Sequence, residues 1–515
     1  MGKFENRQLK NMVSIGITKS DSVCLWMRSE KPGKHEIQIW PEHDENDIIS
    51  VNTEIPKINE NDNTLSVRYP DDFNAQRPLN PTTRYKYRIK RKEDDIILGN
   101  GNFETFPSNL KNTPKDFSIA CMSCHQPFNS DGDVSQRSLR LLRVLPNVLK
   151  KNNVKFILLT GDQIYADVPE NFSLINPHYV NNKILPKKNN IFEFSESEVR
   201  QAYQDRYRIF WNFPEVNHFY ANYPCYPILD DHEIMDDWGS NPNHNKPKFN
   251  NLFKGARRAY LDYQGSRIIS STSLPTSFHY SFEYGSVGVF VMDLRSERKA
   301  FKRRSSQLYS DSQLKDLEDF LENNHDKHVL LIVTSVPVIH LPGWLADIGE
   351  ALVGDKIDFP DHWSFNKNRI ARDNFLNKLY LHQKKYPNQK IALVSGDVHI
   401  GCTFEIKWKK ENNLKMIQFT SSAISNRLKK IEAYAGKLGP KLVSELKCKN
   451  GPSADVSLIQ STKEDSKSEN PFGGLNVGII QIKNNGNDSK VNFKLIGYEA
   501  DEQWNPQTMF ESGEV

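Results

Sequence analysis

The chain has 515 residues, which at about 150 residues per domain is enough for several domains. It carries 68 Lys and Arg against 64 Asp and Glu, so its formal net charge is only +4. A charge so close to neutral argues against a nucleic-acid-binding protein, which needs a strongly basic surface. Apolar residues make up 37% and aromatic residues 11%, so the chain can form large cores and is not disordered throughout.

The sequence has no segment typical of a membrane span or a secretion signal. Its most apolar stretch, residues 329–345, is interrupted by Thr, His and Pro residues, so we expect no transmembrane helix. The N-terminus has neither an apolar core segment nor a twin arginine. We therefore expect a cytoplasmic protein, with signal-less export as the alternative. The six cysteines are scattered and form no disulfide framework, which fits a reducing compartment.

Residues 10–106 are predicted to be all-β. They contain several short runs in which apolar and polar residues alternate, as in Arg84–Lys90, and Gly, Pro, Asn and Asp clusters separate these runs. This pattern favours an N-terminal β-sandwich domain at residues 1–108. Residues 107–114 have the composition of a linker, and the second domain is predicted to span residues 115–515.

From residue 116 onward, near-continuous apolar runs alternate with helical patterns, which predicts an α/β fold of two packed sheets flanked by helices. The predicted strands are 117–122, 154–159, 225–229, 287–292, 328–333, 391–394 and 416–419. The predicted helices include 138–151, 198–210, 312–324 and 367–385. Residues 461–470 are polar and predicted to be a mobile loop, and residues 477–496 are predicted to form a β-hairpin.

Chemically reactive side chains follow directly after four of the predicted strands. They are Cys124; Asp162 and Tyr165; Asp230, Asp231 and His232; and Asp397 and His399. Ligands of α/β sheets bind at the carboxyl ends of the strands, so we expect these side chains to meet at one edge.

These residue types suit a metal centre. Carboxylates can bridge two cations, and a thiolate together with a phenolate suits a ferric ion. Two cations held by shared carboxylates can clamp the attacking and leaving oxygens of a phosphoryl transfer. Each motif alone has a simpler explanation as a turn or a solvated helix start. Four such motifs, each directly after a buried strand, favour the metal centre.

The motifs also resemble, in order, those of the alkaline phosphatase D family, a branch of the calcineurin-like metallophosphatases. The resemblance rests on Ser123-Cys124, Gly161-Asp162-x-Ile-Tyr165, Asp230-Asp231-His232-Glu233, Met292-Asp293-Leu-Arg295-x-x-Arg298 and Gly396-Asp397-Val-His399. It covers roughly residues 10–430, because the first strands look like the family's leading sandwich domain. The family usually has Gln directly after its Cys, where this chain has His125.

The resemblance implies a role for each residue. Cys124, Tyr165 and His399 are expected to bind Fe³⁺, and Asp162 is expected to bridge to a second cation. Asp231 and Asp397 are expected to complete a Ca²⁺ site, for which Mn²⁺ or Zn²⁺ are alternatives. The expected catalytic residues are Asp162 and His232, with His232 near the leaving oxygen as general acid.

Two arginines follow the predicted strand that ends near Asp293. We expect Arg295 and Arg298 to bind substrate, because a guanidinium pairs bidentately with phosphate oxygens. The alternative is an internal salt bridge to Asp293 or Glu297. Asp167 is expected to matter little.

Together these features predict a metal-dependent phosphoester hydrolase that acts on monoesters, diesters or both through a metal-bound hydroxide. The expected substrate is a small phosphoester or a phospholipid-type molecule. One alternative is a non-catalytic or host-directed binding protein built on the same scaffold. A second is a redox protein that uses Cys121 and Cys124, although these cysteines do not open a helix, the context that lowers a thiol pKa.

Overall fold

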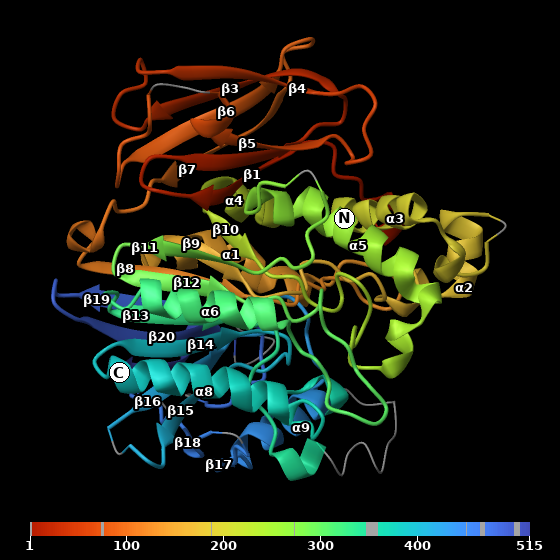
Figure 1. Ribbon diagram of the computed structural model, residues 1–515. Helices are drawn as coiled ribbons and strands as arrows, with labels where there is room; N and C mark the ends of the chain where they lie inside the picture. Colours follow the sequence, from red (N-terminus) through yellow and green to blue (C-terminus); the bar gives the residue numbers. More distant parts are fainter. Residues whose placement is uncertain are drawn as a thin grey trace.

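The computed structural model describes residues 3–73, 77–186, 188–271, 273–346, 359–411, 413–449, 451–463, 469–498 and 505–515. Its strands form four sheets, two small ones near the N-terminus and two large ones in the remainder of the chain (Figure 1).

The two small sheets are antiparallel and lie at the top of Figure 1, drawn red to orange. One contains β1 (Met12–Thr18), β2 (Val23–Arg28) and β5 (Thr64–Tyr69), and the other β4 (Ile49–Ile55), β3 (Gly33–Pro41), β6 (Arg84–Arg91) and β7 (Ile97–Glu104). In β6, Tyr85, Tyr87 and Ile89 are buried, whereas Arg84 and Arg88 are exposed. This alternation builds the core between the two sheets. The domain boundary between residues 108 and 115 stays a prediction.

Each large sheet contains both parallel and antiparallel strand pairs. The six-stranded sheet has the order β10 (Cys225–Pro227), β9 (Val154–Leu159), β8 (Asp116–Met122), β19 (Asn476–Asn484), β20 (Ser489–Gly497) and β21 (Gln507–Glu514). The eight-stranded sheet has the order β11 (Tyr280–Tyr284), β12 (Val287–Val291), β13 (Val329–Val333), β14 (Lys390–Ser395), β16 (Lys415–Thr420), β15 (Cys402–Trp408), β18 (Ala454–Leu458) and β17 (Glu445–Leu446). A buried apolar cluster with members from both sheets fills the space between them.

Helices cover the outer faces of both large sheets, so the predicted α/β class is confirmed. The six-stranded sheet packs against α1 (Gln136–Lys151), α3 (Glu196–Phe210), α4 (Pro214–Asn222) and α5 (Asn250–Tyr263). The eight-stranded sheet packs against α6 (Asp311–Asn323) and α8 (Arg369–Lys385). Two further helices are α2 (Pro177–Tyr179) and α9 (Lys430–Lys441).

Most predicted boundaries lie within a few residues of the observed ones. Strand β10 ends at Pro227, two residues earlier than predicted. Helices α1 and α3 begin two residues earlier than predicted, after the capping residues Ser135 and Ser195. The β19–β20 hairpin is confirmed. Residues 464–468 of the predicted mobile loop lie outside the described residues. Among the helices that the structure describes, none is long and apolar enough to cross a membrane.

The parallel register places the strand ends level with one another. Met122 in β8 pairs with Leu159 in β9, and Leu159 pairs with Pro227 in β10. In the second sheet, Val333 in β13 pairs with Val394 in β14. The segments that follow these strands therefore lie at the same, carboxyl edge of the sheets.

Candidate metal centre

The structure brings the predicted ligands together at the carboxyl edge. One potential ligand atom from each of Cys124, Asp162 and His399 lies within 4.8 Å of the other two. A second group at the same spacing joins Asp162, Asp230, Asp231 and Asp397. Asp162 belongs to both groups, which is the position that a bridging carboxylate needs.

The first group includes the phenol that the sequence predicted. Cys124 Sγ lies 3.3 Å from Asp162 Oδ2, and the Tyr165 hydroxyl donates to the same oxygen at 3.2 Å. The Tyr165 oxygen also lies 3.4 Å from His399 Nε2. Asn426, which the sequence analysis did not identify, donates from Nδ2 to the Tyr165 oxygen at 3.1 Å. Its Nδ2 is also 3.2 Å from His399 Nε2.

The second group leaves buried carboxylate oxygens without hydrogen bonds. Among the described residues, Asp162 Oδ1, Asp230 Oδ2 and Asp397 Oδ2 have no hydrogen-bond partner. Asp231 Oδ1 has only a 3.5 Å ion pair with Arg295. A buried charged oxygen without a partner is costly, whereas a hard cation satisfies several such oxygens at once. The donor atoms present therefore fit a metal centre.

The crowding of these groups shifts their pKa values. Burial, and then the neighbouring Cys124, raise the pKa of Asp162 well above its usual range. Burial also raises the pKa of Asp397 well above its usual range, that of Asp230 to about 6 and that of the Cys124 thiol to about 12. Bound cations favour the deprotonated forms, so metal binding at this centre is expected to release protons.

Four of the candidate ligands have a left-handed backbone. The φ angles are +59° at Cys124, +56° at Asp162, +64° at Asp397 and +53° at His399. Such conformations cost on the order of 1–3 kcal/mol for residues other than glycine, and they cluster at functional sites. Gly161 (φ +101°) permits the turn before Asp162, because a Cβ there would lie 2.6 Å from the Asp230 Cβ.

One buried carboxylate holds two of these strand ends together. Glu233 accepts backbone N–H groups from Asp162 at 3.1 Å, Gln163 at 2.6 Å and Asp230 at 3.0 Å. These bonds join the segment after β9 to the segment after β10. Burial raises the pKa of Glu233 to about 8, while its backbone donors act in the opposite direction. The last residue of the Asp-Asp-His-Glu motif thus orders the ligand loops.

His232 forms a dyad with Asp167, a carboxylate that was expected from the sequence to matter little. His232 Nδ1 lies 2.7 Å from Asp167 Oδ1, and Asp167 Oδ2 accepts the Asp236 backbone N–H at 2.5 Å. Burial opposes the charged imidazole, but the Asp167 and Asp231 carboxylates outweigh it and raise the His232 pKa well above its usual range. A ring nitrogen of His232 also lies within 4.8 Å of oxygens of Asp162 and Asp231.

The two arginines lie beside the centre in an internal ion-pair network. Arg295 Nε contacts Asp230 Oδ1 at 2.6 Å, and its terminal nitrogens contact the carboxylate of Asp361 at 2.6 and 2.9 Å. Arg298 Nη1 lies 3.0 Å from the same carboxylate. The salt-bridge alternative expected Asp293 or Glu297 as partner, but the partners are Asp230 and Asp361. The substrate-binding role stays a prediction.

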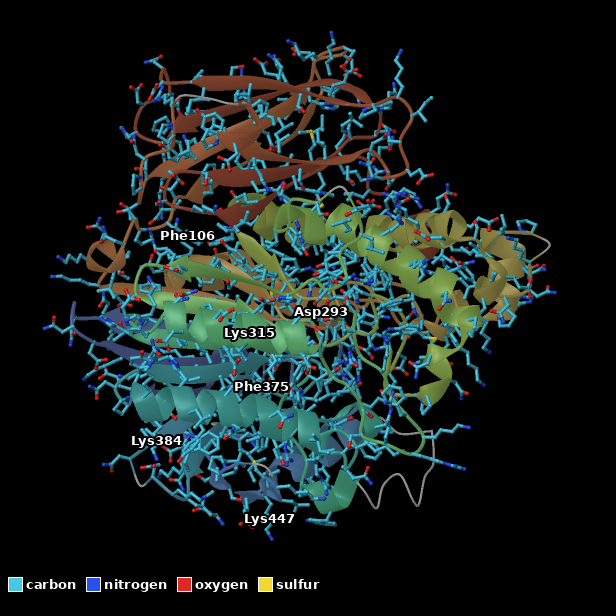
Figure 2. The ribbon with its side chains drawn as sticks, viewed as in Figure 1. Phe106, Asp293, Lys315, Phe375, Lys384 and Lys447 are labelled. Atoms are coloured by element: carbon cyan, nitrogen blue, oxygen red, sulfur yellow. The ribbon has the colours of Figure 1, made fainter. Side chains whose placement is uncertain are left out.

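Asp293 has a different task. It lies in the interior of the molecule (Figure 2), where its Oδ1 accepts the backbone N–H groups of Arg295 and Ser296, both at 2.9 Å. Its Oδ2 accepts the Phe278 N–H at 2.7 Å. This carboxylate therefore shapes the turn that carries Arg295.

Packing explains why this chain has His125 directly after Cys124, where the family that it resembles usually has Gln. His125 is buried, with Nδ1 3.0 Å from Ser425 Oγ and Nε2 2.9 Å from the Phe210 carbonyl oxygen, so its ring joins three segments and does not enter the centre.

Burial raises the pKa of both Cys121 and Cys124. Such thiols lack the thiolate character that a redox dithiol requires.

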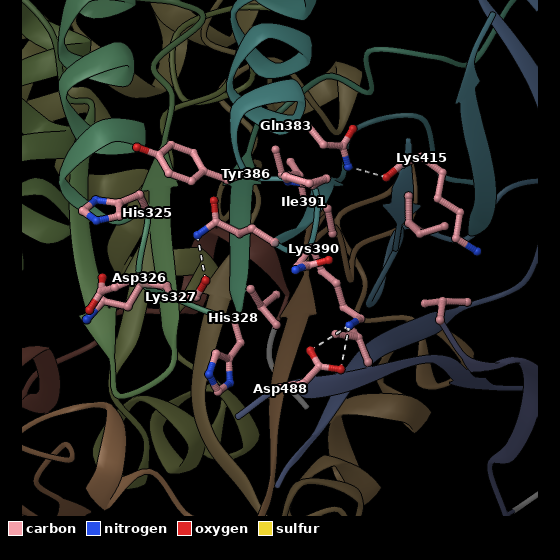
Figure 3. A pocket seen from close by; sticks show the side chains of 18 of the residues that line it. His325, Asp326, Lys327, His328, Gln383, Tyr386, Lys390, Ile391, Lys415 and Asp488 are labelled. Carbon is pink, nitrogen blue, oxygen red and sulfur yellow. Dashed lines mark hydrogen bonds and ion pairs between the residues drawn. The ribbon is translucent and has the colours of Figure 1, made fainter. Parts of the chain in front are cut away.

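A separate cavity lies at the other end of the same strands (Figure 3). It has a volume of about 770 Å³, and residues at the amino ends of β13, β14 and β16 contribute to its wall. Its lysines are engaged: Lys390 pairs with Asp488 at 3.0 Å and Lys415 with Glu405 at 3.0 Å. This cavity contains none of the predicted site residues.

Comparison with known proteins identifies the family. A model of the PhoD-like phosphatases matches residues 119–468, which is more than half of the chain. The chain belongs to the PhoD-like phosphatase family.

A solved structure described as "Structure of PhoD" superposes with a TM-score of 0.66 at 14% sequence identity, over 96% of this chain and 88% of that chain. Bacteroides uniformis β-glucuronidase 2 reaches a TM-score of only 0.24 at 10% identity, over 95% of this chain and 61% of that one. This similarity is too low to indicate a shared fold. No curated protein matches.

Family membership confirms several predictions made from the sequence. The chain is a phosphoric ester hydrolase of a metal-dependent, alkaline phosphatase family, and its substrates are small phosphoesters. The matched residues include the strand ends that carry Cys124, Asp162, Asp231, Asp397 and His399.

Proposed function

We propose that this phosphatase hydrolyses phosphoesters at a two-cation centre bridged by Asp162. The first cation site is assigned to Cys124, Asp162, Tyr165 and His399, and the second to Asp162, Asp230, Asp231 and Asp397. The observation that carries this proposal is the set of buried, unpartnered carboxylate oxygens around Asp162. A thiol and a phenol in the first site favour Fe³⁺, and carboxylates alone in the second favour Ca²⁺.

Cations at these positions would lower the pKa of a water nucleophile and neutralise charge on the phosphoryl group. The chain itself supplies the proton for the leaving group. Asp167 accepts from His232 Nδ1 and thereby fixes the ring, so that Nε2 carries the proton to be donated. Against the effect of burial, the Asp167 carboxylate raises the pKa of His232 and so favours the protonated ring.

Two measurements on the purified protein test the proposal. Elemental analysis is expected to find iron and a divalent metal, and p-nitrophenyl phosphate, bis-p-nitrophenyl phosphate or both are expected to be hydrolysed. Cys124→Ala should lose iron together with any visible charge-transfer absorption. Cys24→Ala removes a fully buried thiol in β2 of the N-terminal sheets, away from the centre, and serves as the matched control.

Three results would contradict parts of the proposal. A protein that takes up no metal from solutions of Fe³⁺, Ca²⁺, Mn²⁺ or Zn²⁺ contradicts the two-cation centre. A loaded protein that hydrolyses neither ester contradicts the proposed reaction and revives the binding-protein alternative. Equal iron content in Cys124→Ala and Cys24→Ala contradicts the assignment of the first site.

A further inference from the structure

Every N–H of the Arg295 guanidinium faces an oxygen of the protein. Nε contacts Asp230 Oδ1 at 2.6 Å, Nη1 contacts Asp361 Oδ1 at 2.6 Å and the Trp238 carbonyl oxygen at 3.2 Å. Nη2 contacts Asp361 Oδ2 at 2.9 Å and Asp231 Oδ1 at 3.5 Å. Four of the five guanidinium N–H groups thus donate hydrogen bonds to the protein, and the fifth faces the Asp231 carboxylate and not a substrate phosphate.

The position of Arg295 is also unlike that of a substrate-binding group. Its side chain is 0% exposed, and those of its partners Asp230 and Asp361 are 0% and 2% exposed. To reach a phosphate, the guanidinium would have to leave the buried Asp230 and Asp361 carboxylates without their cation. Removing one partner of a buried ion pair is strongly destabilising, because it leaves a buried charge without compensation.

Asp361 lies far from Arg295 in the sequence and holds it with both oxygens. The bidentate contact fixes the plane of the guanidinium, which a single contact does not do. Arg298 adds to the same anchor, since its Nη1 lies 3.0 Å from Asp361 Oδ1 and its Nη2 donates to the Asp361 carbonyl oxygen at 2.9 Å. Asp361 is therefore itself held in place by contacts with both arginines.

The effect of this anchor reaches the second cation site. Arg295 Nε occupies Asp230 Oδ1, while Asp230 Oδ2 has no hydrogen-bond partner among the described residues and belongs to the carboxylate group with Asp162 and Asp397. Fixing one oxygen fixes the direction of the other. Groups that orient metal ligands in this way typically change metal affinity or activity by about 10–100-fold when they are removed.

We propose that Asp361 and Arg295 are positioning residues that hold Asp230, and with it Asp231, in the geometry of the second cation site. Arg295 then serves the metal ligands and not the substrate phosphate. This inference rests on the proposed function, because it presupposes a cation bound by Asp230 and Asp231. It assigns a role to Asp361, which no sequence motif indicated.

The test measures Ca²⁺ binding to the intact protein by titration calorimetry, together with inhibition of the metal-saturated enzyme by inorganic phosphate. Asp361→Asn keeps the side-chain shape but places an amide N–H against the guanidinium. Its Ca²⁺ affinity is expected to fall by about 10–100-fold. At saturating Ca²⁺, its kcat and its inhibition by phosphate are expected to match those of the wild type. Arg295→Lys keeps the charge but loses the planar fork, and should show the same pattern.

The matched control is Asp262→Asn. Asp262 holds Arg200 by a bidentate contact at 2.8 and 2.7 Å, in a buried pair outside the centre. This variant should lose stability without any change in Ca²⁺ affinity. If Asp361→Asn does not fold, Arg295→Lys carries the test.

The outcomes separate the two proposals. Wild-type protein that binds no Ca²⁺ overturns the second cation site itself. Wild-type binding together with unchanged affinity in both variants overturns the positioning role alone. Normal Ca²⁺ affinity with weakened phosphate inhibition in Arg295→Lys would instead make Arg295 a substrate clamp, as the sequence suggested.

Discussion

The two ends of the parallel strands differ in how several of their charged side chains are paired. At the amino end, a cavity of about 770 Å³ is bordered by Lys390 and Lys415, and each lysine has a carboxylate partner at 3.0 Å. At the carboxyl end, buried oxygens of Asp162, Asp230 and Asp397 have no hydrogen-bond partner among the described residues.

The backbone differs in the same way. At the carboxyl end, Cys124, Asp162, Asp397 and His399 all have φ between +53° and +64°. Strained backbone and unsatisfied charge at one place are retained only where something compensates for them. The unsatisfied donor atoms therefore favour the carboxyl end as the reactive end that we propose, although the cavity lies at the amino end.

The largest loss is expected from removing the shared carboxylate at the carboxyl end. Asp162→Asn should lose metal and activity together, by about 10³-fold or more in turnover, because metal charge stabilisation contributes several kcal/mol. Asp488→Asn at the amino end is the matched control and should retain both. Metal analysis and steady-state kinetics check this, and an active, fully loaded Asp162→Asn enzyme would exclude a bridging role.

His232→Ala should separate chemistry from metal binding at the same end. We expect the metals to remain and turnover to fall by ~10²–10⁴-fold, the usual range for loss of a general acid. The loss should be smaller for nitrophenyl esters than for alkyl esters, because nitrophenolate leaves without a proton. An equal loss for both leaving groups argues against proton donation, and a loss of metal would make His232 a ligand.

Asp167→Asn should have a smaller effect that reveals the dyad. Turnover is expected to fall by about 10–100-fold, as for other groups that orient a functional histidine. Since Asp167 helps to raise the His232 pKa, its loss should lower that pKa. The protonated form then disappears at lower pH, so the alkaline limb of the kcat–pH profile should move to lower pH. An unchanged profile would return Asp167 to the minor role expected from sequence.

The carboxyl end should also make the stability of the metal-free protein depend on pH. Burial raises the pKa of Asp230 to about 6 and that of Glu233 to about 8. Their unfolded values are about 4, so between about pH 4 and pH 8 the folded state binds more protons than the unfolded state, and stability falls as pH rises. Thermal unfolding with a chelator should show this fall. Added Ca²⁺ should reduce this fall in stability. If the difference in unfolding temperature between the Ca²⁺-loaded and the metal-free protein does not widen as pH rises, the raised pKa values of these carboxyl groups are not the cause.

Sequence alone could place the carboxyl-end ligands because each follows its strand directly. Near-continuous apolar runs identify β8, β9, β12, β13 and β14, and the residue after each turn is then confined to one edge of the sheet. The structure places potential ligand atoms of Cys124, Asp162 and His399 within 4.8 Å of one another, and their role as ligands stays a prediction.

Other parts of the centre could not be predicted, because they depend on contacts between segments far apart in the chain. Asp361 meets Arg295 across 66 positions, and Asn426 meets Tyr165 across 261. Asp167 is close in the fold to His232 but 65 positions away in sequence. No periodicity or spacing rule records such pairings, since tertiary packing alone creates them.

The smallest effect is expected at the amino end. Lys390→Ala breaks the pair with Asp488, in which both side chains remain partly exposed at 30% and 49%. Exposed pairs contribute at most about 1 kcal/mol, so a small shift in the unfolding midpoint is the whole expected result. Metal content, kcat and KM should match the wild type, because no predicted site residue lines this cavity. A clear fall in kcat with normal metal content would mean that the two ends of the strands are coupled, and that satisfied polar groups at the amino end also serve the reaction.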